Sequence, residues 1–501
     1  MFRDVLSTYA ARFAGLLAQI ILLPLVLSHV GLSAYGVYTV TVAFVALFQQ
    51  DLGVGNAMTR FVSIARGAED WQTVQDFTDA ANSLFTIVAA VAMLLSSVAF
   101  YILWPHLHIP SNLDREALSL AVMAVGGLGI SLISSPYRQL LYSFGRMSRA
   151  NGIQFSQQVV RILLTLIAVN LSASVVVVGL ADLVAIVFGA AFLMVTVYKD
   201  SDVYTPKLGR MPMQAARELF SVSMYLLVIS ISGLLIVQFG SIASSIRFSA
   251  AVAGLFAGAQ RVYFVVKEVT NSLSIAVLPR ASESVGSGEV GVTADLYSRG
   301  TQLANMLMVA LAVPLMGAMP FWLKAWAGAP MVAASSSAIV LILSLIANNN
   351  HLLAIPILTA HGKLGWFAIL HATWAVSAIV LAFVFGSASG DAGSPIGVAL
   401  GIAIPVLLLE PFYILVTLRV LRVPWISFLT RSILLPYLPG VLGIFGFFAV
   451  RRYVGLDTTS VLLSSALWIA ICAPSFVFQL PERSRRWLVV STKTLIPRRA
   501  R

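Results

Sequence analysis

Charge is scarce in this chain. Asp, Glu, Lys and Arg together make up 10% of the 501 residues, whereas soluble globular domains average about 25%. The hydrophobic residues reach 59% and the mean hydropathy is +0.91. A soluble fold does not need this composition, so we expect an integral membrane protein.

The chain has one cysteine and no nucleotide-binding motif. Cys472 is the single cysteine, which excludes an internal disulfide and predicts a packing role within its apolar run. No phosphate-binding loop occurs, so the chain is not expected to hydrolyse ATP. His106 and His108 share a short loop, but two histidines without further ligands are a weak metal signal. We therefore expect no metal and no cofactor.

Long apolar runs fill the chain and leave no room for a soluble domain. A run of about 20 residues crosses a hydrocarbon core of roughly 30 Å. The first run contains Arg12 and lacks a small-x-small cleavage site, so we expect a retained helix. The pattern predicts an all-α protein of about 14 transmembrane helices, at 5–28, 37–60, 80–104, 117–142, 153–171, 175–198, 219–241, 251–278, 301–321, 332–359, 364–386, 396–418, 432–450 and 459–480.

Basic residues gather on one side of these spans. If the N-terminus is cytoplasmic, the opposite side receives only Arg115, Arg247, Lys324, Arg451 and Arg452 of the 32 Lys and Arg. This positive-inside bias places both termini in the cytoplasm. It also explains the net charge of +12 without nucleic-acid binding, because cytoplasmic loops beside anionic lipid are normally basic.

Two short motifs recur at a nearly constant offset. Ala34-Tyr35-Gly36-Val37-Tyr38 matches Val252-Ala253-Gly254-Leu255-Phe256, and Ser143-Phe144-Gly145-Arg146 matches Ala360-His361-Gly362-Lys363. They favour a parallel repeat of two six-helix lobes, although glycine is common at span ends and chance similarity is the alternative. The expected divisions are an N-terminal lobe at 1–200, a cytoplasmic linker at 201–218, a C-terminal lobe at 219–420, accessory spans at 421–480 and a basic tail at 481–501.

Charged residues inside spans are the candidate site, because a charge near the bilayer centre is costly unless it faces a cavity or a partner. A cluster of guanidinium groups suits a phosphate-bearing ligand. For Arg12, Lys267 and Glu268 the alternative is a position near the cytoplasmic surface. The candidate substrate-binding cations are Arg12, Arg60, Arg161, Arg261 and Lys267.

The buried acids and an asparagine run complete the candidate set. Asp51, Asp182, Glu268 and Glu410 are expected either to carry a coupling proton or cation or to pair with a nearby Arg. The run Asn348, Asn349 and Asn350 is expected either to line a cavity or to join helices by hydrogen bonds.

The segment 22–31, the run from Ala34 to Tyr38, and Asp51-Leu52-Gly53-Val54-Gly55 followed by Arg60 form a series of small-residue patterns. This series resembles the opening of the polysaccharide (O-antigen type) flippases of the multidrug, oligosaccharidyl-lipid and polysaccharide exporter (MOP) superfamily, and the resemblance spans nearly the whole chain. Further matches are Pro279, Trp326-Ala327-Gly328 and Leu358 to Lys363. Many relatives have an Asp where this chain has Gln238-Phe239-Gly240-Ser241, which leaves that Asp's role without a residue here.

The resemblance implies a two-lobed, V-shaped alternating-access transporter with a cationic cavity. The implied activity is the transfer of an undecaprenyl-pyrophosphate-linked oligosaccharide to the periplasmic leaflet of the bacterial inner membrane. We expect a monomer that acts with membrane lipid, a polysaccharide polymerase and chain-length proteins. The alternatives are a drug/cation antiporter of the same superfamily, or a polyprenyl-dependent glycosyltransferase or polymerase. An antiporter should have twelve spans and a buried acid where this chain has Arg12, and an enzyme should have more external acids.

Overall fold

The described part of the chain consists of α-helices joined by short turns and loops. The computed structural model describes residues 2–49, 53–200, 204–207, 209–221, 224–275, 277–286, 290–388, 394–454 and 457–479, and these ranges contain no β-strand. The predicted all-α class is confirmed. The tail at 481–501 and Asp51 lie outside the described residues.

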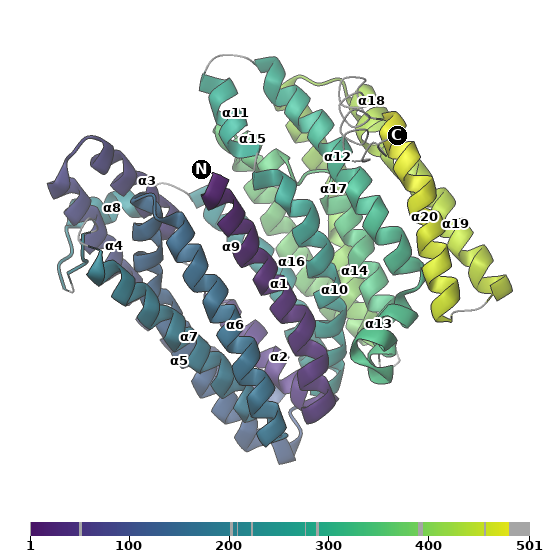
Figure 1. Cartoon of the computed structure of the whole chain (residues 1–501), viewed down its shortest axis with the longest axis horizontal. Helices are drawn as coiled ribbons and strands as arrows, with labels where there is room; N and C mark the ends of the chain where they lie inside the picture. Colours follow the sequence, from purple (N-terminus) through teal and green to yellow (C-terminus); the bar gives the residue numbers. More distant parts are fainter. Residues whose placement is uncertain are drawn as a thin grey trace, which may run out of the picture. The chain divides into compact units, whose positions relative to one another are not determined.

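The first part of the chain forms nine α-helices, which Figure 1 labels in chain order. Their bounds are α1 Phe2–Val30, α2 Leu32–Ala46, α3 Val54–Gly67, α4 Trp71–Leu103, α5 Asp114–Ser143, α6 Met147–Leu171, α7 Val175–Lys199, α8 Met213–Ser221 and α9 Met224–Arg247. Two short 3₁₀ turns, Trp104–His106 and Ser111–Leu113, join α4 to α5.

The later part contributes eleven more. They are α10 Ala250–Ile275, α11 Val277–Gly286, α12 Val290–Gly317, α13 Met319–Ala327, α14 Ser335–Asn348, α15 Ala354–Ala360, α16 Gly365–Ala388, α17 Ile396–Leu421, α18 Trp425–Phe428, α19 Leu435–Val454 and α20 Thr458–Gln479. A 3₁₀ turn at Ala329–Ala334 precedes α14, and a π-helical turn at Leu429–Leu434 precedes α19.

Twelve segments of the described chain are long and apolar enough to cross a membrane, and each overlaps one of the predicted spans. The predicted spans at 37–60 and 251–278 are not among the twelve. The second corresponds to α10, which has 26 residues but contains Arg261, Lys267 and Glu268. The count of fourteen therefore stays a prediction, while the multi-pass membrane architecture is confirmed.

Two predicted spans are broken rather than continuous, which corrects the sequence prediction. In 37–60, α2 ends at Ala46 and α3 begins at Val54, after Gly53 adopts a left-handed conformation with φ of 78°. In 332–359, α14 ends at Asn348 and α15 begins at Ala354. There the Asn350 side-chain amide donates to the carbonyl oxygens of Ile346 and Ala347, at 3.4 and 3.2 Å. A side chain that bonds to these carbonyls competes with continued helix.

The glycines of the first repeated motif pack against each other. An added Cβ at Gly36 would overlap the carbonyl oxygen of Ala250, and one at Gly254 would lie 3.1 Å from the carbonyl oxygen of Leu32. An offset of 218 relates Gly36 to Gly254 and Leu32 to Ala250. Each contact is therefore the counterpart of the other, which is the signature of a two-fold relation.

The second repeated motif ends two helices in the same way. Gly145 and Gly362 both adopt positive φ, 71° and 67°. After α5, the Arg146 amide donates to the Leu141 carbonyl at 2.7 Å, and after α15 the Lys363 amide donates to the Leu358 carbonyl at 2.9 Å. Both are Schellman caps, in which glycine takes the left-handed position. The shared caps and the reciprocal contact support the predicted parallel repeat.

Contacts divide the chain into two units. The first unit comprises Met1–Arg261, Trp326–Ala338 and Phe367–Pro405, and the second comprises Val262–Ala325, Ile339–Trp366 and Val406–Arg501. The first unit includes α9 along with the N-terminal helices, so the predicted lobe boundaries stay a prediction.

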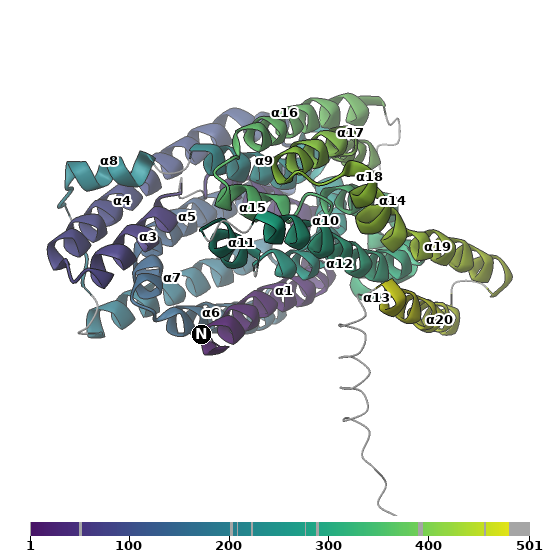
Figure 2. The ribbon, with the colours of Figure 1, turned by 90° about the horizontal axis from the view of Figure 1, so that it is seen from above.

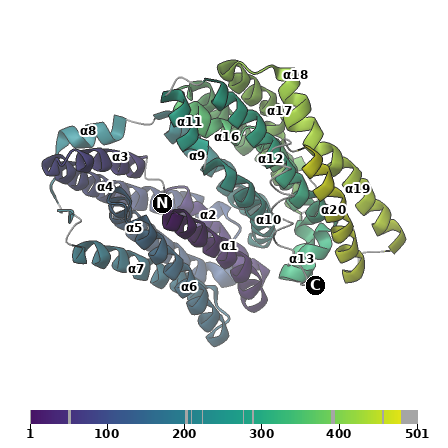
Figure 3. The ribbon, with the colours of Figure 1, turned by 45° about the horizontal axis from the view of Figure 1, so that its top comes forward.

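Within the first unit, α1 packs along α6, and α5 packs against α4 and α7. At one end of this unit α8 lies against α3 and α4 (Figure 2). Within the second unit, α19 and α20 pack beside α12 (Figure 3). Cys472 is buried there with Val309, Val313, Phe447 and Trp468, in agreement with the packing role expected for it.

Candidate functional site

Arg261 lies near the middle of α10 and is half-buried. Its Nη1 donates a hydrogen bond to Oε1 of Gln19 on α1 at 2.7 Å, and its guanidinium also lies beside the Tyr35 hydroxyl on α2. Both partners are neutral. Within the described ranges, no ion pair with a carboxylate neutralises Arg261, so its positive charge is available to an anion.

Arg161 on α6 is neutralised by Asp182 on α7. The Arg161 Nε lies 2.6 Å from Asp182 Oδ1, and Nη2 lies 3.1 Å from Oδ2, which is the parallel two-bond geometry of strong guanidinium–carboxylate pairs. Tyr38 on α2 completes the group, because its hydroxyl accepts from Arg161 at 2.9 Å and donates to Asp182 at 2.5 Å. Of the two alternatives for Asp182, the structure has the pair with arginine.

Two tyrosines of α2 connect these arginines. Tyr35 and Tyr38 are three residues apart, which puts them on one helix face, and their ring centroids are 6.4 Å apart. Both are nearly buried, with 2% and 7% of their surface exposed. Arg161 and Arg261 both act electrostatically on both hydroxyls. The tyrosines belong to the repeated motif, so the segment that forms the two-fold contact also supplies the polar site.

A cavity of about 340 Å³ adjoins this group. Its polar lining includes Tyr38, Gln158 and Arg161, and its apolar lining comes from α2, α5 and α7. The Gln158 Oε1 is buried and finds no donor among the described residues. We name Gln19, Tyr35, Tyr38, Arg161, Asp182 and Arg261 the arginine–tyrosine cluster.

The second unit contains a separate polar group at the break between α14 and α15. His351 Nδ1 lies 2.6 Å from Glu410 Oε2 of α17, and both side chains are almost fully buried. The sequence prediction paired Glu410 with an arginine as the alternative to coupling. The structure gives it a histidine.

The asparagine run joins helices around this break. Asn349 donates to Asn305 Oδ1 on α12 at 2.9 Å, and Asn305 donates to Asn350 Oδ1 at 2.7 Å. Tyr437 of α19 donates to Asn305 Oδ1 at 2.8 Å. Asn349 and Asn350 therefore hold helices together, which was one of the two expected roles, while Asn348 is half-buried at the end of α14.

The remaining predicted residues lie elsewhere. Lys267 on α10 is half-buried in the second unit, with its ammonium 5.6 Å from the Tyr263 ring centroid. Glu268 follows it and is also half-buried. Arg60 is exposed on α3, with its guanidinium 5.7 Å from the Phe61 ring centroid. Arg12 lies in α1, but its side chain is outside the described part of the structure.

Sequence reasoning did not single out Gln19, Tyr35, Tyr38, Asn305 or His351. Only His351 had a readable signal, because it directly follows the asparagine run and a buried acid needed a partner. The others are ordinary residues for a membrane helix, and only the packing of distant segments gives them partners.

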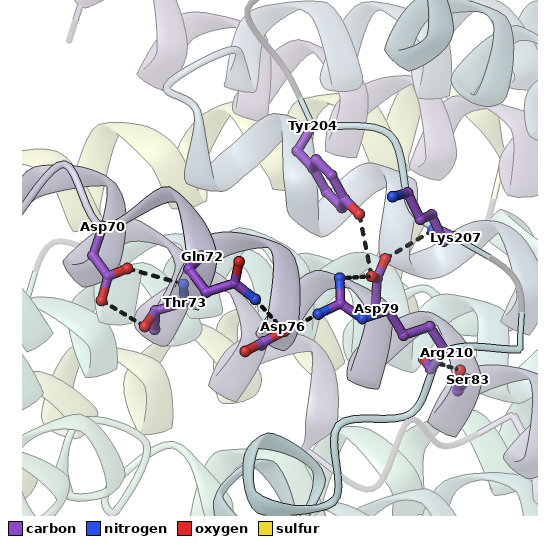
Figure 4. A network of polar contacts seen from close by, with 9 residues as sticks. All are labelled: Asp70, Gln72, Thr73, Asp76, Asp79, Ser83, Tyr204, Lys207 and Arg210. Carbon is purple, nitrogen blue, oxygen red and sulfur yellow. Dashed lines mark hydrogen bonds and ion pairs between the residues drawn. The ribbon is translucent and has the colours of Figure 1, made fainter.

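A polar clamp lies at the start of α4 (Figure 4). Asp79 is fully buried and accepts from the Lys207 amide at 2.8 Å, the Tyr204 hydroxyl at 3.1 Å and Arg210 at 3.3 Å. Arg210 also pairs with Asp76 at 2.7 Å. Partial burial and the Asp79 carboxylate raise the pKa of Tyr204. The clamp fixes Tyr204, Lys207 and Arg210, which lie within the linker predicted at 201–218, to α4.

Comparison with protein families gives one match. The model of the family described as "Polysaccharide biosynthesis protein" matches residues 1–285. No curated protein matches the chain in sequence.

Solved structures share the fold at low identity. A lipid II flippase MurJ in an inward closed conformation has a TM-score of 0.71 at 14% identity, over 95% of this chain and 98% of that one. An inward-facing multidrug resistance MATE transporter of the MOP superfamily has 0.69 at 16%, over 82% and 95%. A MOP transporter from Pyrococcus furiosus, described as having a binding pocket of reversed polarity, has 0.60 at 16%, over 84% and 95%.

Proposed function

Because the chain belongs to the polysaccharide biosynthesis protein family and has the fold of MOP transporters, we propose that it flips a lipid-linked sugar. The substrate is an undecaprenyl-pyrophosphate-linked oligosaccharide repeat unit, which moves from the cytoplasmic to the periplasmic leaflet of the bacterial inner membrane. The product supplies surface polysaccharide such as O-antigen, capsule or exopolysaccharide. The observation that carries this proposal is Arg261, a half-buried cation near the middle of α10 that is held by neutral partners.

The charge balance of the arginine–tyrosine cluster favours an anionic ligand. Asp182 is fully engaged by Arg161 and Tyr38, so it offers nothing to a cation. Among the described residues Arg261 is held by a glutamine and a tyrosine, both neutral, so the charges of the cluster sum to a net positive value. A pyrophosphate supplies several negative oxygens, which guanidinium donors bind by charge-assisted hydrogen bonds. The two tyrosine hydroxyls add neutral donors beside these oxygens.

A site on membrane-embedded helices suits a substrate whose lipid tail stays in the membrane. Such a substrate only has to bring its head group to the cluster, since the polyprenyl chain stays in hydrocarbon. The head group then crosses the bilayer when the repeats reorient. The solved relative named a lipid II flippase handles a lipid-linked head group, which agrees with this proposal.

A drug/cation antiporter is the second candidate, because a multidrug transporter shares the fold. A cationic drug needs a buried carboxylate that is not already neutralised. In the first unit Asp182 does not meet this need, which is why the anionic substrate is favoured.

The test is Arg261→Ala in a strain deleted for the chromosomal gene. A hydrogen bond to a charged group contributes about 1.5–3 kcal/mol, so head-group affinity should fall about 10- to 150-fold. We expect loss of surface polysaccharide and accumulation of one undecaprenyl-pyrophosphate oligosaccharide, measured by mass spectrometry of extracted lipids.

The matched control is Arg299→Ala. Arg299 is 61% exposed and pairs with Asp295 within α12, so its loss should leave polysaccharide unchanged. Immunoblots of membranes must show equal amounts of both variants. Normal polysaccharide in Arg261→Ala would contradict the proposal, and altered drug tolerance with unchanged lipids would favour the antiporter.

A further inference from the structure

The break between α14 and α15 lies inside the span predicted at 332–359. The span Ala329–Asn348 ends where the chain turns, and α15 resumes at Ala354. The amides of Asn350 and His351 donate to carbonyls only three residues back, at 3.0 and 3.3 Å. Interrupted membrane helices place polar backbone and side chains at depth, and transporters commonly use them for coupling ions. The residue at the centre of this interruption is His351.

His351 and Glu410 form a tightly held pair. Nδ1 and Oε2 are 2.6 Å apart, and the side chains are 1% and 8% exposed. The Tyr413 ring stacks on the imidazole with a centroid distance of 4.0 Å, which fixes the ring orientation. Both atoms are acceptors when deprotonated, so this distance requires a proton between them.

Glu410 lies near the middle of α17, one of the helices long and apolar enough to cross a membrane. Eleven positions along the helix take the chain from Glu410 to Leu421, about 16 Å at 1.5 Å per residue, which is close to half of a hydrocarbon core of roughly 30 Å. The Glu410 side chain is 8% exposed, so its charge depends mainly on the protein groups around it.

The second oxygen of Glu410 has room for a proton. Oε1 is buried and has no hydrogen-bond partner among the residues that the structure describes. An unpartnered buried carboxylate oxygen is costly when ionised, whereas a protonated carboxyl group removes the charge. A sodium ion fits less well, because hard cations prefer sets of oxygen ligands and one of the two paired atoms is nitrogen.

Among the described residues, the charged and titratable groups around the pair come from four helices. Lys267 of α10 is a cation that acts electrostatically on His351. Glu410 acts on the hydroxyls of Tyr297 of α12, Tyr413 of α17 and Tyr437 of α19.

The charge of the pair changes by one on proton binding. With a single shared proton, ionised Glu410 and neutral His351 have a net charge of −1. A second proton brings the pair to neutrality, which suits a buried site. In the charged state, Lys267 is the cation positioned to compensate.

We propose that the His351–Glu410 pair is the proton-coupling site of the transporter. One proton per cycle binds to the pair from periplasmic water and leaves to cytoplasmic water, while the lipid-linked anion moves outward. This inference rests on the proposed flippase function, to which it adds the driving ion.

Glu410→Gln separates this role from a structural one. The glutamine side-chain oxygen can still accept a hydrogen bond from His351 Nδ1, so the pair is retained, but the amide cannot take up the second proton. A purely structural pair would leave transport and its pH dependence close to wild type. Asp295→Asn, at an exposed acid of α12, is the matched control.

The full chain is reconstituted into lipid vesicles with undecaprenyl pyrophosphate as the probe. Transfer across the bilayer is measured as access to a phosphatase added outside, with and without an imposed pH gradient. For wild type and Asp295→Asn we expect the gradient to change the rate at least tenfold, and for Glu410→Gln we expect one rate under both conditions. A gradient response in Glu410→Gln, or its absence in wild type, would overturn the inference while leaving the flippase proposal intact.

If the wild-type protein does not move the probe, that result counts against the flippase proposal itself. Infrared spectroscopy of the same vesicles then tests whether Glu410 binds a proton. Acidification should produce a protonated-carboxyl band that is lost in Glu410→Gln, and its absence from wild type would refute the proton site. If Glu410→Gln does not accumulate, His351→Gln replaces it. The pH at which the band appears should then shift by at least one unit, and an unchanged pH would refute the proposal.

Discussion

Removing Asp182 should destabilise the first unit strongly, because Arg161 would be left as an unpaired charge within the membrane. The two side chains are 26% and 17% exposed, so solvent compensates only in part. Two unit charges about 4 Å apart interact by about 4 kcal/mol at an effective dielectric constant of 20. Loss of one partner of a buried pair typically costs about 3–5 kcal/mol.

Asp182→Asn tests this value directly. The amide nitrogen of asparagine would face guanidinium donors, so at most one of the two Arg161 bonds survives. A loss of about 3 kcal/mol corresponds to a fall in apparent Tm of about 4–5 °C for a unit of this size. Unfolding of purified protein is followed by circular dichroism at one scan rate, because membrane-protein unfolding is commonly irreversible.

The double variant Arg161→Leu with Asp182→Leu provides the decisive comparison. The double variant leaves no unpaired charge, so its Tm should lie close to that of the wild type and above the Tm of either Arg161→Leu or Asp182→Leu alone. We expect a coupling energy of about 2–3 kcal/mol in the double-mutant cycle. Additive effects, with coupling below about 0.5 kcal/mol, would refute the view that these residues act as one neutralised pair.

Three further changes test the fold around the site. Asp79→Ala removes the acceptor of the polar clamp in Figure 4, and a loss of about 1.4 kcal/mol should make trypsin cut after Lys207 about tenfold faster; equal rates would count against the clamp. Gly36→Ala places a methyl group against a backbone carbonyl and should cost about 1–3 kcal/mol of thermal stability, whereas Gly15→Ala, with open space around it, should not. Asp70 caps α4 by accepting from the Thr73 hydroxyl and amide, which lowers its pKa. Protection of the first turn of α4 from hydrogen exchange should therefore persist as pH falls through the ordinary Asp range and disappear below the lowered pKa, and constant protection would contradict this.

The membrane class was readable from the sequence because hydropathy is a property of each span by itself. The interruptions of two spans were less readable. The break before Val54 depends on Gly53 adopting positive φ, and the break after Asn348 depends on an asparagine side chain bonding to carbonyls of its own helix. Glycine and asparagine also occur within unbroken helices, so the presence of either residue type does not predict a break.

The candidate site was only partly readable for a similar reason. Rarity of charge within a span identified Arg161, Arg261 and Asp182, since the bilayer makes each of them costly. Tyr35 and Tyr38 are not costly in a span, and their role arises only because α2 lies between two arginines. Sequence spacing reports neighbours along one helix, whereas these contacts join residues more than 100 positions apart.

The repeat matches in backbone geometry but not in the charges of the two polar sites, and this contrast bears on the roles of the two halves. The offset of 218 that relates Gly36 to Gly254 takes Arg161 to Ile379 and Glu410 to Phe192. Arg161 and Glu410 thus each correspond to an apolar residue in the other half. A duplicated scaffold with unduplicated charges can move symmetrically while binding different ions at different places. If the two proposals hold, the arginine–tyrosine cluster of the first unit would bind the lipid-linked anion and the His351–Glu410 pair of the second unit would carry the proton, so that neither site would compete for the other's ligand.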